Sequence, residues 1–107
     1  MPKDYKVQIG GRSIDVLFRS EDEMRSVLSN SPETYFFGCW QAKPGIIMID
    51  ETLKGYDRQQ TVIHEELEAI NQTFGLDLDH RTLTTIAEGF SQLFSNINVC
   101  RSNIKGN

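Results

Sequence analysis

Cysteine is scarce in this sequence, and long apolar runs are absent. Cys39 and Cys100 are the only cysteines in 107 residues, too few for the disulfide framework of a small secreted domain. We therefore expect free thiols, with a single disulfide between them as the alternative. No apolar run approaches the ~18 residues that indicate a membrane span, and the N-terminal segment MPKDYKVQIGG lacks the apolar core of a signal peptide. These absences favour a cytoplasmic protein that does not enter membranes.

Basic clusters are absent as well. The net charge is −4 and no segment concentrates lysine and arginine, so the electrostatic footprint of a nucleic-acid-binding protein is missing. Hydrophobic residues make up 38% of the chain, enough for one compact core. We expect a single domain over residues 1–97 and a flexible C-terminal tail over 98–107.

The N-terminal half has the pattern of short strands. Apolar residues alternate on both sides of Gly10-Gly11, which predicts a hairpin with strands near 4–9 and 12–18. A short helix over about 20–29 follows, because Ser20 and Glu23 form a capping-box pattern. Two further strands are predicted at 36–41 and at 46–50, where the continuous apolar run IIMID indicates burial on both faces.

The C-terminal half has helical periodicity. One helix is predicted from Asp57, as its cap, to about Phe74, with Gly75 as the residue that ends it. A second helix is predicted from Asp79 or His80 to about Asn96. The apolar stripes expected to pack these helices together are Ile63, Leu67, Ile70 and Phe74 on the first helix, and Leu83, Ile86, Phe90, Leu93 and Ile97 on the second. The predicted fold class is α+β, with a small, mostly antiparallel sheet packed against two long C-terminal helices.

The segment HEELE, residues 64–68, differs by one letter from the HExxH motif of zinc peptidases. His64 and Glu68 are four residues apart, so both side chains lie on one face of the predicted helix and can point at one ion. Glu65 is offset around the helix, where a carboxylate can act as general base without binding the metal. The spacing therefore predicts two metal ligands and one catalytic base.

A catalytic zinc normally needs a third protein ligand. His80 is the first candidate, because the tight connection before it returns the chain towards the helix that carries His64. Asp77 and Asp79 are candidates for fixing an imidazole tautomer by a hydrogen bond. Glu88 is the competing third ligand and ranks lower, because its helical position points away from the predicted core stripe.

The order of IIMID, TVIHEELEAI, GLDLDH and TLTTIAEGFSQLF resembles the small zincin-like metallopeptidases encoded by bacteriophages and mobile elements. The likeness covers about residues 44–96. It implies a minimal zincin-like fold, with His64, Glu68 and His80 as metal ligands and Glu65 as general base. It also implies that IIMID is the edge strand that lines the cleft. The chain departs from the family pattern at Glu68, where histidine is commoner.

Glu68 in place of histidine changes the expected metal chemistry. A carboxylate is a good zinc ligand, but its negative charge makes the ion a weaker Lewis acid. A site richer in carboxylates also discriminates less against Mn²⁺ or Fe²⁺. We expect Zn²⁺, with Mn²⁺ or Fe²⁺ as alternatives, and a site better suited to holding metal than to fast hydrolysis.

The sequence leaves several functions open. The first is a minimal metal-dependent peptidase acting on a protein or peptide partner. The second is a non-enzymatic phage or mobile-element protein that binds and inhibits a host protein through a zincin scaffold. The third is a structural metal domain, in which the ion holds two helices together. The fourth is that the chain binds no metal, and that His64 and its neighbouring glutamates form a solvated acidic face of the helix.

Overall fold

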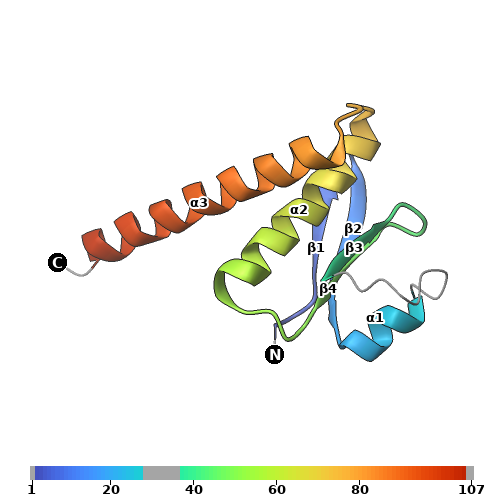
Figure 1. Cartoon of the computed structure of the whole chain (residues 1–107), viewed down its shortest axis with the longest axis horizontal. Coiled ribbons are helices and arrows are strands. Elements are labelled where there is room, and N and C mark those ends of the chain that lie inside the picture. Colours follow the sequence, from blue (N-terminus) through green and yellow to red (C-terminus); the bar gives the residue numbers. More distant parts are fainter. Residues whose placement is uncertain (1, 28–36, 106–107) are drawn as a thin grey trace.

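The computed structural model describes residues 2–27 and 37–105, with side chains described up to residue 95. Four strands and three helices follow one another as β1 (Tyr5–Ile9), β2 (Arg12–Arg19), α1 (Glu21–Val27), β3 (Gly38–Gln41), β4 (Ile46–Asp50), α2 (Gly55–Phe74) and α3 (His80–Lys105) (Figure 1). The α+β class and the order of elements predicted from the sequence are confirmed. Residues 28–29 of the predicted first helix and residue 36 of the predicted third strand lie outside the described residues.

The four strands form one mixed, mostly antiparallel sheet in the order β1-β2-β4-β3. The pairs β1–β2 and β3–β4 are antiparallel, and β2–β4 is parallel. Strand β4 is therefore an interior strand, and Ile47, Met48 and Ile49 are buried in it, as its apolar run predicted. The expectation that IIMID is an edge strand is wrong, because β3 pairs along its outer side and takes the edge position.

A two-residue turn at Gly10 and Gly11 joins β1 to β2. Both glycines have positive φ, 59° and 76°, which is the conformation that a tight hairpin requires and that side chains disfavour. A Cβ added to Gly10 would lie 2.8 Å from Cγ2 of Thr73. The hairpin turn is therefore packed against the last turn of α2.

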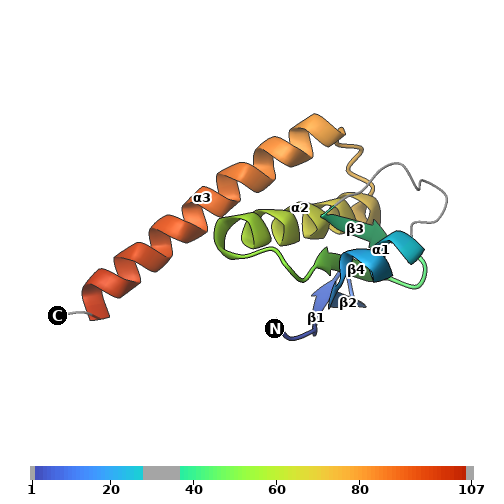
Figure 2. The same cartoon turned by 60° about the horizontal axis from the view of Figure 1, so that its bottom comes forward.

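The core lies between α2 and one face of the sheet. It contains Ile9, Ile14, Val16, Phe18, Ile47, Ile49 and Ala69. Side chains alternate between faces along a strand, so Met48 points to the opposite face, where Met24 of α1 is also buried. Figure 2 shows α2 between the sheet and α3, so that the molecule is layered as sheet, helix, helix.

Helix α3 packs on α2 through a stripe of smaller side chains than the sequence predicts. Leu83, Ala87 and Ser91 are buried at four-residue spacing, and the Gln59 amide of α2 donates a hydrogen bond of 2.8 Å to the Ser91 carbonyl. The expected stripe is wrong in part, because Phe90 is 41% exposed, Leu93 55% and Phe74 58%. Small residues let two helix backbones approach closely, and the larger apolar side chains then lie beside the contact.

The boundaries of the two long helices differ from prediction at two points. Helix α2 begins at Gly55 with Lys54 as N-cap, so Asp57 lies inside the first turn, where its charge suits the helix dipole. Helix α3 continues to Lys105, past the predicted end near Asn96 and through residues where a flexible tail is expected. No glycine or proline lies between residues 90 and 105, and extending an existing helix costs little per residue.

The predicted ends at the connection between these helices are confirmed. Gly75 has φ 62°, and the N–H groups of Gly75 and Leu76 bond to the carbonyls of Gln72 and Asn71, as in a Schellman motif. Asp79 caps α3 by accepting a 2.7 Å hydrogen bond from the Thr82 N–H. In the described part of the chain, no helix has both the length and the apolar character needed to cross a bilayer.

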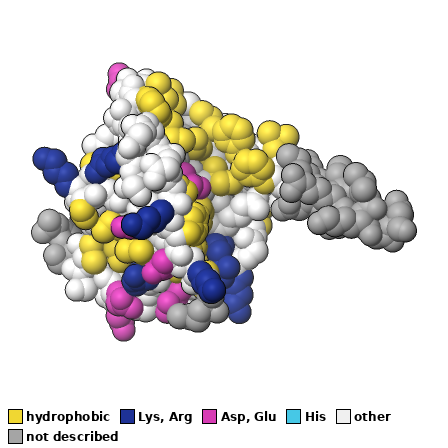
Figure 3. Space-filling model, turned by 180° about the vertical axis from the view of Figure 1, so that it is seen from behind, with side chains coloured by type: hydrophobic (Ala, Val, Ile, Leu, Met, Phe, Trp, Pro, Cys, Tyr) yellow, Lys and Arg dark blue, Asp and Glu magenta, His cyan; other side chains and the backbone are white. Residues whose placement is uncertain are grey.

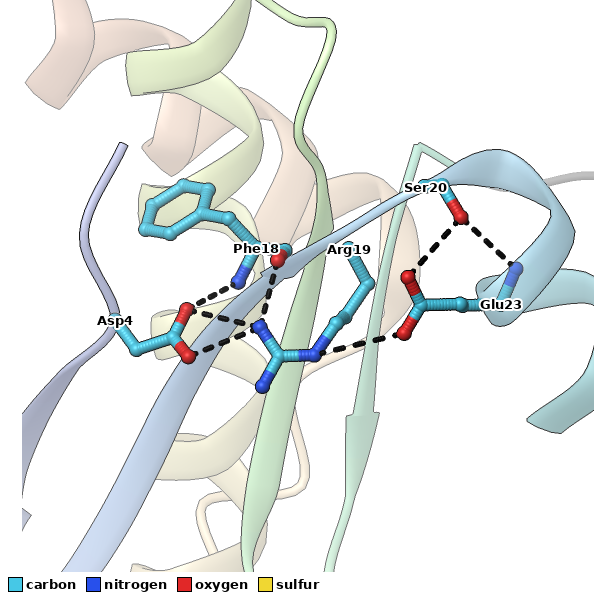
Figure 4. Close-up of polar contacts among 5 residues, drawn as sticks. All are labelled: Asp4, Phe18, Arg19, Ser20 and Glu23. Carbon is cyan, nitrogen blue, oxygen red and sulfur yellow. Dashed lines mark hydrogen bonds and ion pairs between the residues drawn. The ribbon is translucent and has the colours of Figure 1, made fainter. Parts of the chain in front are cut away.

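A polar cluster fixes the start of the hairpin and of α1 (Figure 4). The Asp4 carboxylate accepts hydrogen bonds from the Phe18 N–H at 2.9 Å and from the Arg19 guanidinium at 2.9 and 3.0 Å. Ser20 caps α1 by accepting a 3.2 Å bond from the Glu23 N–H, and its hydroxyl donates to the Glu23 carboxylate. The capping box predicted from the sequence is thus present.

Candidate metal centre

Three residues from two helices meet at one end of the α2–α3 pair. His64 and Glu68 lie one turn apart on α2, and Nε2 of His64 is 3.9 Å from Oε1 of Glu68. Nδ1 of His80, the first residue of α3, is also 3.9 Å from that oxygen. The two imidazole rings are nearly perpendicular, with centroids 5.1 Å apart. The structure therefore brings together the three residues that the sequence singles out as ligands.

The arrangement fits a small divalent ion. One ligand atom from each residue lies within 4.8 Å of the other two. A tetrahedral zinc ion with bonds of roughly 2.0–2.2 Å holds its ligand atoms about 3.3–3.5 Å apart, so the group must contract, by up to about 1.5 Å for its most distant pair. The His80 side chain is 80% exposed and can turn to provide this contraction. Two imidazoles and one carboxylate are also a donor set known for catalytic zinc.

The turn between the helices determines where His80 lies. Asn71, in the last part of α2, donates from its side-chain amide to the Leu78 carbonyl at 3.1 Å and accepts from the Leu78 N–H at 2.9 Å. Asp77 adopts a left-handed conformation with φ 59°. Asn71 belongs to no motif in the sequence. Its only sequence signal is a residue type that often bonds to nearby backbone.

The other candidates have different surroundings. Glu88 is exposed on α3 and lies outside the group of ligand atoms. One carboxylate oxygen of Asp79 is engaged by the Thr82 N–H, which is the main cause that holds the Asp79 pKa below its usual value. Asp79 therefore serves mainly as a helix cap.

Glu65 lies beside the three ligands without joining them. It is 9% exposed and lines a pocket of about 270 Å³ together with His64 and His80. Burial, with a smaller contribution from the charge of Glu68, raises the Glu65 pKa to about 7. Burial also lowers the pKa of His64. A carboxyl group with a pKa near neutrality can both accept and return a proton.

Strand β3 forms the wall of this pocket opposite α2. Phe37 and Gly38 line the pocket, and a Cβ added to Gly38 would lie 2.8 Å from Cγ2 of Thr61 and 3.0 Å from Cγ of Glu65. Glycine lets the edge strand pass close to the helix that carries Glu65. The sequence signal for this close approach is a glycine inside the strand predicted at 36–41.

Comparisons with protein-family models, with curated proteins and with solved structures gave no significant match.

Proposed function

We propose that this chain is a zincin-like metal-binding protein that acts in the cytoplasm as a minimal metal-dependent peptidase. His64, Glu68 and His80 would hold one divalent ion, Zn²⁺ first and Mn²⁺ or Fe²⁺ as alternatives. The observation that carries the proposal is the position of His80. It comes from a different helix, yet its Nδ1 lies as close to Glu68 Oε1 as His64 Nε2 does, 3.9 Å in both cases.

A divalent ion at this position supplies Lewis-acid chemistry, polarising a substrate carbonyl and making water more acidic. Glu65 would be the general base, taking up a proton from the attacking water and returning it to the departing amine. In the metal-free chain burial raises its pKa to about 7, so Glu65 is a stronger base there than an ordinary carboxylate. Phe37 and Gly38 line the same pocket as Glu65.

The substrate class that fits best is an extended segment of a protein. Strand β3 is an edge of the sheet and also lines the pocket that contains Glu65. A peptide that pairs with an exposed edge gains affinity from backbone hydrogen bonds. Such a segment beside β3 would have its carbonyl groups within reach of the pocket.

The metal half of the proposal is tested by elemental analysis of gently purified protein. We expect about one equivalent of metal in the wild type, a sharp loss in His64→Ala and in His80→Ala, and no loss in Glu88→Gln. Glu88 is a matched control because it is an exposed α3 residue and the competing ligand candidate. Retention of metal in His64→Ala would overturn the site. Loss of metal in Glu88→Gln, together with retention in His80→Ala, would show that Glu88 and not His80 is the third ligand.

The catalytic half is tested with Glu65→Gln, which keeps size but removes basicity. Folding and metal content should persist while hydrolysis of a panel of unfolded and native proteins falls by about 10²–10⁴-fold. Glu68→His restores the commoner ligand and a more positive metal centre, so activity should rise. Should Glu65→Gln keep full biological activity and Glu68→His gain none, the chain is a non-enzymatic binding protein on this scaffold.

A structural metal role is the second candidate, favoured because the three ligands join α2 to α3. Close contact between these helices is made by small side chains such as Ala87 and Ser91, and a bridging ion would strengthen it. In that case chelation lowers the midpoint of thermal unfolding strongly, and Glu65→Gln has no functional effect. A peptidase site instead loses activity on chelation while the fold persists.

A further inference from the structure

A second hollow lies on the other side of α2 from the candidate metal centre. It has a volume of about 310 Å³ and is formed by β1, α2 and α3, with lining side chains that include Val7, Ile63, Leu67, Phe90 and Phe94. Strand β1 is the free edge of the sheet opposite β3. Figure 3 shows apolar side chains gathered along α3 and on the adjoining body. None of the three proposed metal ligands lines this groove.

Glu66 is the only charged residue among the side chains that line the groove. It is partly buried, and no hydrogen bond or ion pair to it is found among the described residues. The nearest cation of β1, Lys6, contacts Asp15 instead. A wholly apolar occupant would bury the Glu66 carboxylate without a partner, which is strongly unfavourable. An occupant that brings a positive charge avoids this cost, whereas an apolar occupant leaves the carboxylate unpaired or forces a proton onto it.

The aromatic side chains of the groove favour the same kind of ligand. Phe90 and Phe94 lie one turn apart on α3 with stacked rings, 6.1 Å between centroids, and are 41% and 46% exposed. Ring faces attract cations. A guanidinium group is planar, weakly hydrated and able to bind a carboxylate through two parallel hydrogen bonds, so it suits this surface better than an ammonium group.

We propose that this groove binds a segment of a partner protein that presents an arginine flanked by apolar side chains. The arginine pairs with Glu66 and lies against Phe90 and Phe94. The flanking side chains cover Ile63, Leu67 and Val7. This site is independent of the proposed metal centre, and it can be occupied whether or not the protein is a peptidase.

The probe for the test is a fluorescein-labelled peptide, Gly-Leu-Leu-Arg-Leu-Phe-Gly, with a second peptide in which citrulline replaces arginine. Citrulline has the shape of arginine without its charge. Fluorescence anisotropy should give a dissociation constant at least about tenfold lower for the arginine peptide on the wild-type chain. Glu66→Gln should remove that difference. Glu88→Gln, an exposed α3 carboxylate outside the groove, should retain it.

Amide chemical shifts of the wild-type protein locate the binding, and we expect changes at Val7, Leu67 and Phe90. Equal affinity for the two peptides, or a preference that survives in Glu66→Gln, would overturn the proposal. Changes confined to residues outside the groove would do the same. The alternative occupant is a second copy of this chain, and sedimentation velocity tests for it. A wild-type dimer that is dissociated by Phe90→Glu would show that a second copy occupies the groove and would overturn the proposal.

Discussion

Asn71 and Leu78 are joined by two hydrogen bonds through a single side-chain amide, one donated and one accepted. These bonds close the turn between α2 and α3 two residues before His80. Asn71 is one turn from Glu68 on the same helix, so one segment of α2 both carries a proposed ligand and fixes the backbone that leads to another. The precision of the candidate site therefore depends on a residue that touches none of its ligand atoms.

Replacing Asn71 by alanine should weaken metal binding without removing a ligand. The Leu78 N–H and carbonyl lose their partner and bond to water instead, because this turn is exposed, and His80 then samples more positions. We expect at least about tenfold weaker zinc affinity in a competition titration with a chelating dye. Gln72→Ala is the matched control, because that side chain bonds to Trp40 on β3 and not to the turn. Equal affinities in the two variants would exclude the positioning role.

Much of the fold follows from local patterns in the sequence. Strand alternation on either side of Gly10-Gly11 predicts the hairpin, and IIMID predicts a buried strand. The i, i+4 spacing of His64 and Glu68 places them on one helical face, whatever the rest of the chain does. The meeting of His80 with this pair follows from a short connection that offers few paths back to α2.

Other features depend on contacts that no local pattern encodes. The apolar run of β4 indicates that this strand is buried, but it does not indicate which strands flank it. The edge position of β3 therefore could not be derived from the sequence. From the sequence, Phe90 and Leu93 are expected in the packing stripe of α3 because they are large and apolar. In the structure the close contact with α2 is made by Leu83 and its smaller neighbours. The bonds of Asn71 exist only after the turn has adopted its own conformation.

The packing of α3 predicts opposite effects for two leucines on the same helix. Leu83 is 2% exposed and Leu93 is 55% exposed. Leu83→Ala should lower the free energy of unfolding by about 2–5 kcal/mol through lost burial and the cavity left behind. Leu93→Ala should change it by less than about 0.5 kcal/mol. Urea denaturation of both variants checks the pair, and a larger loss in Leu93→Ala would mean that the helix presents the other face to α2.

Asp4 should make the fold sensitive to acid. The hydrogen bond from the Phe18 N–H and the interactions with Arg19 hold the Asp4 pKa below its ordinary value of 3.8. A lowered folded-state pKa stabilises the protein above the unfolded pKa, and that contribution is lost as the pH falls through the folded value. Asp4→Asn should therefore be less stable than the wild type at pH 7, with the difference narrowing below pH 3.8.

Thermal unfolding from pH 2 to pH 7 measures the Asp4 effect. Asp15→Asn is the control for loss of one negative charge on the same hairpin, because that carboxylate has only an exposed 3.7 Å contact with Lys6. A constant difference between wild type and Asp4→Asn across the whole range would show that Asp4 acts through its shape and not through its charge.

Glu65 should have the opposite effect on stability in metal-free protein. Its folded-state pKa is about 7 against an ordinary value of 4.5, so the folded chain holds this proton more tightly than the unfolded chain does. Below about pH 4.5 Glu65 is protonated in both the folded and the unfolded chain, so it does not change the free energy of unfolding. Between about pH 4.5 and pH 7 this carboxyl is ionised in the unfolded chain but still protonated in the folded chain, so the free energy of unfolding falls until the folded carboxyl ionises as well. One pKa unit corresponds to about 1.4 kcal/mol, so the loss above pH 7 is on the order of 3 kcal/mol.

Glu65→Gln cannot ionise, and its stability should not show this decline between pH 4.5 and pH 7. Urea unfolding of both proteins in excess chelator, at pH 4.5 and pH 8, makes the comparison. At the lower pH the two should be close in stability, and at the higher pH the variant should be the more stable one. Such a pattern would show that ionisation of the buried Glu65 carboxyl destabilises the fold. Parallel pH profiles in the two proteins would show that Glu65 ionises freely in the folded chain and would remove the physical reason for treating it as a base poised near neutral pH.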